Sequence, residues 1–78
     1  MAIKGITAKY RDEKPIALLN DILIYGFEID NNRDLNVVIL CNDRFRANRV
    51  FQDKHGEPYF VHFDKKYYLS NAKSRSIK

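Results

Sequence analysis

The sequence contains few of the residues from which recognisable binding and catalytic motifs are built. It has a single cysteine, Cys41, so an internal disulfide bond is excluded, and no CxxC, HxxxH or carboxylate pair has the spacing of metal ligands. The three glycines, Gly5, Gly26 and Gly56, lie too far apart to form a phosphate-binding loop. The RNP aromatic signature, the KH loop and zinc-finger spacings are also absent. We therefore expect no metal and no other cofactor, and no family motif can be matched residue by residue.

Long apolar runs are missing as well. No segment approaches the roughly 18 apolar residues that span a membrane, and residues 1–10 lack the basic-then-apolar pattern of a secretory signal. Together with the single cysteine, this predicts a cytoplasmic protein that makes no membrane contact. With 78 residues, 45% of them apolar and 31% charged, the chain has the composition of one globular domain with one small core.

Candidate catalytic residues are sparse. His55, Glu57 and His62 could act as general acid and base beside Arg49 or Lys65, which is the combination that a metal-independent ribonuclease needs. Nothing in their spacing requires that chemistry, and His55 lies in a turn segment, where a polar residue is expected in any case. We predict a protein without catalytic activity.

What the sequence does have is positive charge concentrated at one end. The net charge is +4, but residues 1–64 carry nine basic and ten acidic residues, a balance of −1, whereas residues 65–78 carry five basic and no acidic residues. A cationic cluster of this kind favours binding to a polyanion, because counterions are released when it meets phosphates. The simpler alternative is a solvated arm that aids solubility. We expect a compact domain over residues 1–72 and a basic tail over residues 73–78.

Apolar periodicity predicts the elements of the N-terminal half. Residues 3–11 alternate between apolar and polar side chains, which is typical of a strand. Residues 15–25 have apolar side chains at helical spacing between Pro15 and Gly26, which indicates one short helix. Two strands turning at Asn20 and Asp21 are the alternative, since isoleucine and tyrosine favour sheets. Residues 27–30 and 35–41 predict a hairpin whose second strand is central and ends at Cys41.

The C-terminal half predicts a three-stranded meander. Residues 53–57 form a turn signal in which Gly56 takes a left-handed conformation, so that Phe51 lies opposite Tyr59. A second turn over residues 64–66 would place on one core face the side chains of Phe51, Tyr59, Val61, Phe63, Tyr67 and Leu69. A two-residue turn at residues 64–65 would instead exchange Tyr67 with Tyr68 between the faces. The fold class is therefore α+β, a small, mainly antiparallel sheet of about five or six strands with one short helix; an all-β small barrel is the alternative.

The other face of this meander is the candidate binding site. Phe60, His62 and Tyr68 would form a platform on which unpaired bases stack. The alternative is that the helix covers this face and buries Phe60 and Tyr68. Arg44 and Arg46 would point to the same side of an extended strand. The residues expected to contact phosphates are Arg44, Arg46, Arg49, Lys54, Lys65, Lys66, Lys73 and Arg75.

Two hypotheses of function follow. The first is a small basic nucleic-acid-binding protein that prefers RNA or single strands to duplex DNA, since no predicted helix carries a row of basic residues for the major groove. Frequent Asn, Lys, Ile, Tyr and Phe suit an AT-rich genome such as that of a phage, where such a protein would bind RNA and inhibit a host nuclease or toxin. The second is a protein-binding inhibitor or regulatory subunit that contacts a host enzyme directly. The sequence leaves the oligomeric state open.

Overall fold

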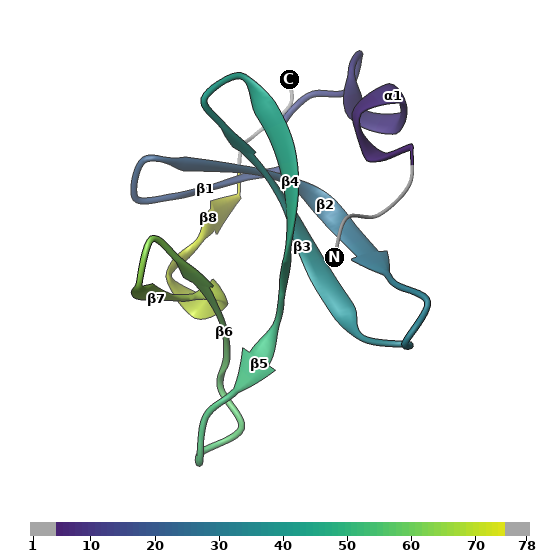
Figure 1. Ribbon diagram of the computed structural model, residues 1–78. Coiled ribbons are helices and arrows are strands. Elements are labelled where there is room, and N and C mark those ends of the chain that lie inside the picture. The colour runs from purple at the N-terminus through teal and green to yellow at the C-terminus, as the bar shows by residue number, and fades with distance from the viewer. Residues whose placement is uncertain (1–4, 75–78) are drawn as a thin grey trace.

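Two antiparallel β-sheets make up the fold, and the chain runs from the larger sheet into the smaller one and then back to an edge of the larger one (Figure 1). The computed structural model describes residues 5–74. Its elements are α1 (Ile6–Tyr10), β1 (Ala17–Leu19), β2 (Ile22–Ile29), β3 (Leu35–Cys41), β4 (Arg44–Arg49), β5 (Phe51–Gln52), β6 (Pro58–His62), β7 (Lys65–Tyr68), the 3-10 helix η1 (Leu69–Asn71) and β8 (Lys73–Ser74). The strand orders are β4-β3-β2-β1-β8 and β5-β6-β7. The described residues thus form mainly antiparallel sheet with one short α-helix, as expected, but with eight strands in two sheets that do not close into a barrel.

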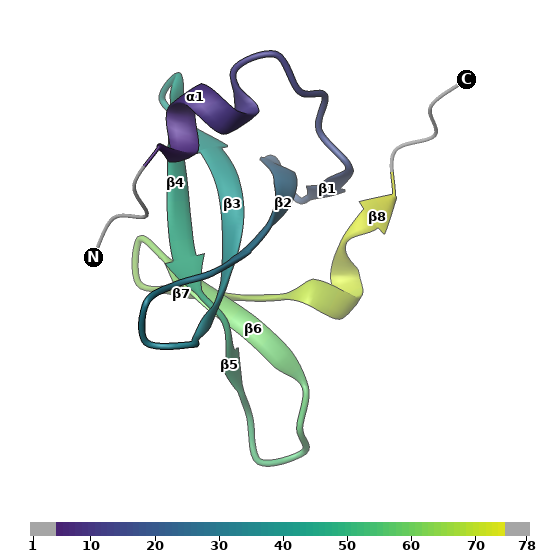
Figure 2. The same ribbon diagram turned by 90° about the vertical axis from the view of Figure 1, so that its right-hand side faces the viewer.

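The first element differs from the prediction. Residues 6–10 form the helix α1 instead of part of a strand, and residues 3 and 4 lie outside the described residues. Ile6 and Tyr10 are four residues apart, so a helix also places them on one side. Tyr10 is buried in this arrangement. The helix lies at one end of the larger sheet, and the β5–β6 hairpin projects from the opposite end (Figure 2).

Residues 15–25 form a hairpin, so the prediction of a helix there is wrong and the two-strand alternative is confirmed. Asn20 takes the left-handed φ of 53° at the turn, and β1 pairs with β2 through Leu19 and Ile22. The apolar spacing suited both structures, because a hairpin also brings Leu19, Ile22 and Ile24 to one buried face. Pairing with β3 decides between them, since it satisfies the backbone groups of β2 and buries its side chains.

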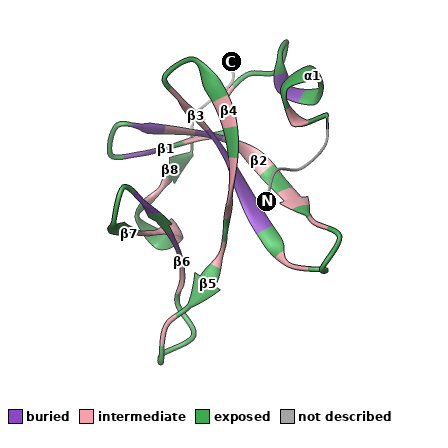
Figure 3. Cartoon of the chain, viewed as in Figure 1, coloured by how far each residue is buried: buried purple, intermediate pink, exposed green. Residues whose placement is uncertain are grey.

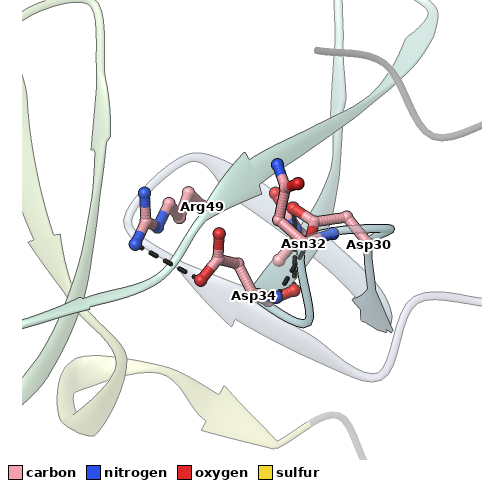
Figure 4. Close-up of polar contacts among 5 residues, drawn as sticks. Asp30, Asn32, Asp34 and Arg49 are labelled. Carbon is pink, nitrogen blue, oxygen red and sulfur yellow. Dashed lines mark hydrogen bonds and ion pairs between the residues drawn. The ribbon is translucent and has the colours of Figure 1, made fainter.

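The predicted hairpin of residues 27–30 and 35–41 is confirmed and extended at its first strand. β3 lies between β2 and β4, ends at Cys41, and buries Val37, Val38 and Ile39 completely. The turn that precedes β3 is held by Asp30, whose carboxylate accepts hydrogen bonds from the backbone N–H groups of Asn32 and Asp34, both at 2.9 Å (Figure 4). These bonds lower the pKa of Asp30, because they stabilise its ionised form.

Tyr10 fastens α1 to the sheet. Its hydroxyl donates to the carboxylate of Glu28, which also accepts from Lys9 Nζ at 2.6 Å. Burial and the neighbouring Glu28 raise the pKa of Tyr10 to about 12, so the hydroxyl remains a donor. The ring lies directly over Gly26, where a Cβ atom would be 2.7 Å from the tyrosine oxygen and 3.0 Å from Cε1. Glycine at this position therefore makes the close approach of the helix possible.

Replacing Gly26 with alanine is expected to destabilise the protein by about 1 to 3 kcal/mol, because the new methyl group overlaps a ring that Glu28 holds in place. Urea unfolding followed by circular dichroism measures the effect. In a Tyr10→Ala background the same substitution should cost much less, since the obstructing ring is gone. An equal cost in both backgrounds would show that Tyr10 does not fasten α1 against Gly26.

The C-terminal meander β5-β6-β7 confirms the predicted three strands. Phe51 lies opposite Tyr59, and Gly56 has the left-handed φ of 80° expected of the first turn. The second turn differs, because Phe63 and Asp64 occupy it with φ values of 50° and 64°, the two positive φ angles of a type I′ turn. The turn therefore begins one residue earlier than either predicted turn, and the residues that flank it, His62 and Lys65, pair with each other.

The two-residue length of this turn determines which β7 side chain shares a face with Phe60. Phe60 and its cross-strand partner Tyr67 point toward the larger sheet, so Tyr67 and Tyr68 occupy the faces that the shorter predicted turn gave them. Phe60 is 0% exposed and packs with Leu19, Ile22, Ile24, Val37 and Ile39 between the sheets. Figure 3 shows buried segments, in purple, in strands of both sheets. The expected core face is therefore wrong for Phe51, Tyr59, Val61 and Phe63, of which Phe63 is 72% exposed.

The start of the expected basic tail belongs to a sheet. Lys73 and Ser74 form β8 and pair with Leu18 and Ala17 of β1. Residues 75–78, including Arg75, lie outside the described residues. Across residues 5–74, no helix is both long enough and apolar enough to cross a membrane.

Candidate nucleic-acid interface

A row of three aromatic side chains crosses the outer surface of the smaller sheet. Phe51, Tyr59 and Tyr68 are cross-strand partners on β5, β6 and β7, with ring centroids 5.8 Å apart for Phe51 and Tyr59 and 5.4 Å apart for Tyr59 and Tyr68. Successive residues of a strand point to opposite faces, so the inward direction of Phe60 turns Tyr59 outward. We call these three residues the aromatic face. Phe51 is 40% exposed, and the other two rings are half-buried.

Two cations lie over this face. The guanidinium carbon of Arg49 is 5.3 Å from the centroid of the Phe51 ring, and Lys66 Nζ is 5.0 Å from the centroid of the Tyr59 ring. Arg49 also forms an ion pair of 3.3 Å with Asp34 (Figure 4). Exposed cation–π contacts contribute about 0.5 to 1 kcal/mol each, so these side chains can exchange a ring for another partner at little cost.

The third ring, Tyr68, lies near the carboxylate of Asp53 in the β5–β6 turn. The Asp53 carboxylate accepts hydrogen bonds from the backbone N–H groups of His55 at 2.8 Å and Glu57 at 2.9 Å, and these bonds lower its pKa. Burial, followed by the hydrogen bond to Asp53, raises the pKa of Tyr68. The phenol therefore stays protonated.

The predicted stacking residues occupy different positions from those expected. Phe60 and His62 are buried in the structure, so they form no exposed platform, and this prediction is wrong. Tyr68 lies on the opposite face from them, beside Phe51 and Tyr59, which the sequence reasoning had assigned to the core. Asp64 was the available signal for the two-residue turn that puts Tyr68 on the face of Tyr59, since aspartate tolerates the left-handed conformation that this turn requires at its second position.

The predicted phosphate contacts divide into separate groups. Arg49 and Lys66 lie over the aromatic face, while Lys54 is exposed in the β5–β6 turn. Lys73 is exposed on β8, an edge strand of the larger sheet, and is therefore not brought to the smaller sheet by pairing. Arg44, Arg46 and Lys65 form a third group, described next, and Arg75 lies outside the described residues.

We call Arg44, Arg46 and Lys65 the basic corner. Arg44 and Arg46 share one side of β4, and a hydrogen bond of 3.0 Å from Asn48 Nδ2 to the carbonyl of Val61 ties β4 to β6. Lys65 is the cross-strand partner of His62, so it lies on the face of the hairpin opposite Tyr59. Burial, and then the positive charge of Arg46, lower the pKa of His62. Lys65 therefore lies on the opposite side of the β6–β7 hairpin from the aromatic face, and Arg46 of β4 lies near His62 on the same side as Lys65.

The stability of the protein is expected to fall as the pH drops below the ordinary histidine pKa of about 6.5. The pKa of His62 is lowered in the folded state, so the unfolded chain binds the proton more readily. The stability that neutral His62 provides is therefore present above about pH 6.5 and is lost below it. Urea unfolding between about pH 7.5 and pH 5.5 measures the slope. His62→Gln should flatten it, whereas His55→Gln in the exposed turn should not. Equal slopes for both variants would contradict this assignment.

Comparisons of the chain with protein-family models, with curated proteins and with solved structures find no match. The described residues define a small protein of two antiparallel sheets, one with five strands and one with three.

Proposed function

We propose that the protein is a cytoplasmic, non-catalytic binder of single-stranded or unpaired RNA and that the aromatic face is its binding surface. The observation that carries this proposal is the row of Phe51, Tyr59 and Tyr68 across three strands with Arg49 and Lys66 over the rings. Flat rings on a sheet stack on unpaired bases, which contributes about 1 to 3 kcal/mol per base, while neighbouring cations bind the phosphates.

The same surface favours single strands over duplexes. Bases in a duplex are stacked on one another and cannot lie on a sheet, whereas unpaired bases can. Duplex readers of the major groove commonly insert a helix, and α1 is a helix of five residues whose Tyr10 is turned toward the larger sheet. Recognition on the sheet is therefore the better fit.

Binding should weaken steeply as salt is added. Each phosphate neutralised on a single strand contributes about −0.7 to the slope of log affinity against log salt, so Arg49→Gln and Lys66→Gln should each make the slope shallower by about that amount. Fluorescence anisotropy of a labelled single-stranded RNA between about 50 and 200 mM salt provides the measurement. Arg11→Gln, which removes the same charge from an exposed position after α1, is the control and should change the slope less. An affinity of the unsubstituted protein that is independent of salt would rule out the electrostatic part of the proposal.

A second function, inhibition or regulation of a host enzyme by direct contact, is favoured by a different surface. Phe27 and Ile29 of β2 and Leu35 of β3 are exposed apolar side chains, with Ile29 62% exposed and paired with Leu35. Exposed apolar clusters of this kind often form protein interfaces. Capture from a bacterial lysate after ribonuclease treatment distinguishes the two functions. A partner that is retained after ribonuclease treatment and lost in the Ile29→Asp variant supports direct contact. A partner that is lost on ribonuclease treatment is held through RNA, as expected of a protein that binds RNA and inhibits a host nuclease or toxin.

A further inference from the structure

The tip of the β6–β7 hairpin exposes an aromatic side chain in an unfavourable backbone conformation. Phe63 is 72% exposed and has a φ of 50°, which bulky side chains rarely adopt. Asparagine or glycine would suit the position better. Residues held in such conformations often lie at functional sites, and the inference runs from the observed conformation to the function.

The ring of Phe63 is supported from below. Its centroid is 4.4 Å from that of the buried His62 ring, which in turn lies 6.4 Å from the ring of Tyr67. The two rings are tilted by 45°, so the contact positions the phenylalanine ring while most of the side chain remains in solvent. The tip therefore presents a flat apolar surface at a defined place.

Unpaired cations accompany this ring. Arg44, Arg46 and Lys65 are all exposed. Among the residues that the structure describes, the ion pairs are Lys9 with Glu28 and Arg49 with Asp34, and none involves the basic corner. Cations without carboxylate partners are available to an anionic ligand, which favours nucleic acid over an apolar protein surface at this tip.

These observations place three surfaces along one hairpin: the aromatic face, the tip and the basic corner on the opposite side. Resting on the function proposed above, we propose that a single strand bound on the aromatic face continues around the β6–β7 turn, with one unpaired base stacked on Phe63 and the next phosphates bound by Arg46 and Lys65. From Tyr59 to Phe63 the path is about 13 Å, given a rise of about 3.3 Å per residue. A duplex, whose persistence length is about 150 base pairs, cannot reverse direction over that distance. The ligand is therefore a flexible single strand or an extended loop.

The length of the ligand separates the tip from the aromatic face. Labelled single-stranded RNAs of about four and about 12 nucleotides both lie within the range of site sizes, about 4 to 16 nucleotides, found on small sheet proteins. Phe63→Asn and Arg46→Gln should each weaken binding of the longer RNA by about tenfold and leave binding of the shorter RNA within about twofold. Phe63→Asn should also raise the melting temperature, because asparagine accepts the positive φ. Asn42→Gly, at the corresponding position of the β3–β4 turn, is the control and should affect neither length.

Each outcome of this experiment is informative. Equal losses for both lengths would place Phe63 on the primary binding surface and overturn the proposed path around the turn. Unchanged binding of both lengths by Phe63→Asn would also overturn it, while leaving the aromatic face as the binding surface. Failure of the unsubstituted protein to bind either RNA would overturn the proposed function and this inference together. A protein partner that survives ribonuclease treatment and is lost in Phe63→Asn would assign the tip to protein recognition instead.

Discussion

Replacing Phe60 with alanine is expected to destabilise the protein by about 3 to 5 kcal/mol, which is much of the stability of a small domain. The phenylalanine is 0% exposed, packs with the core residues of the larger sheet and stacks on Tyr67 with a centroid distance of 5.5 Å. Its removal would leave a cavity where the two sheets meet. Urea or thermal unfolding followed by circular dichroism measures the loss.

Phe63→Ala is the matched control for this prediction, because it removes the same atoms from the same hairpin at an exposed position. Its effect should lie within about 1 kcal/mol of zero, since little buried area is lost. If both alanine variants lost stability equally, the placement of Phe60 inside and Phe63 outside would be contradicted, and with it the orientation of the aromatic face.

The double substitution Phe51→Leu with Tyr59→Leu should weaken RNA binding by about 2 to 4 kcal/mol, or roughly 30-fold to 1,000-fold. Leucine keeps much of the apolar area that the sheet needs, but it has no flat ring for a base to stack on. The double substitution also removes the rings over which Arg49 and Lys66 lie, so these two cations are no longer held over the sheet. Anisotropy titration at fixed salt provides the measurement.

Phe27→Leu is the control for this substitution. Phe27 is a strand phenylalanine that is 44% exposed, close to the 40% of Phe51, but it lies on β2 away from the aromatic face. Its replacement should leave RNA affinity within about twofold. Equal losses in the two proteins would mean that ring stacking on the smaller sheet does not contribute to binding.

The parts of the fold that could be predicted are those determined by local chemistry. Asp53 and Gly56 define the β5–β6 turn whatever surrounds it, because aspartate accepts the turn's backbone N–H groups and glycine adopts the positive φ. The meander and the opposition of Phe51 and Tyr59 follow from that turn.

Tertiary pairing decided the parts that could not be predicted. The apolar residues of 15–25 fit one face of a helix as well as one face of a hairpin, and only the neighbouring strand β3 favours the hairpin. The assignment of faces failed for a similar reason. β6 has apolar side chains at Tyr59, Phe60 and Val61, so its alternation does not identify the core face. The length of the second turn decides whether Tyr67 or Tyr68 shares a face with Phe60, and turns of two and three residues give opposite answers.

Some of the residues predicted for the candidate site lie together in the structure, but the two faces of β6 were assigned the wrong way round. Aromatic and basic side chains do meet on the C-terminal sheet, and Tyr68, Arg49 and Lys66 were among those named beforehand. Phe51 and Tyr59 take the places expected of Phe60 and His62, because the faces of β6 are exchanged.

The most direct test of this account is the titration of the isotopically labelled protein with single-stranded RNA of about 12 nucleotides, followed through its backbone amide signals by two-dimensional NMR. We expect the largest shifts at Phe51, Tyr59 and Tyr68, with further shifts at Arg49 and Lys66. Signals around Ile29 in the β2–β3 hairpin should remain unchanged, whereas Asp34 in the turn, the ion-pair partner of Arg49, should shift with Arg49. Shifts confined to that hairpin, or no shifts at about 50 mM salt, where electrostatic binding is strong, would contradict RNA binding by the aromatic face.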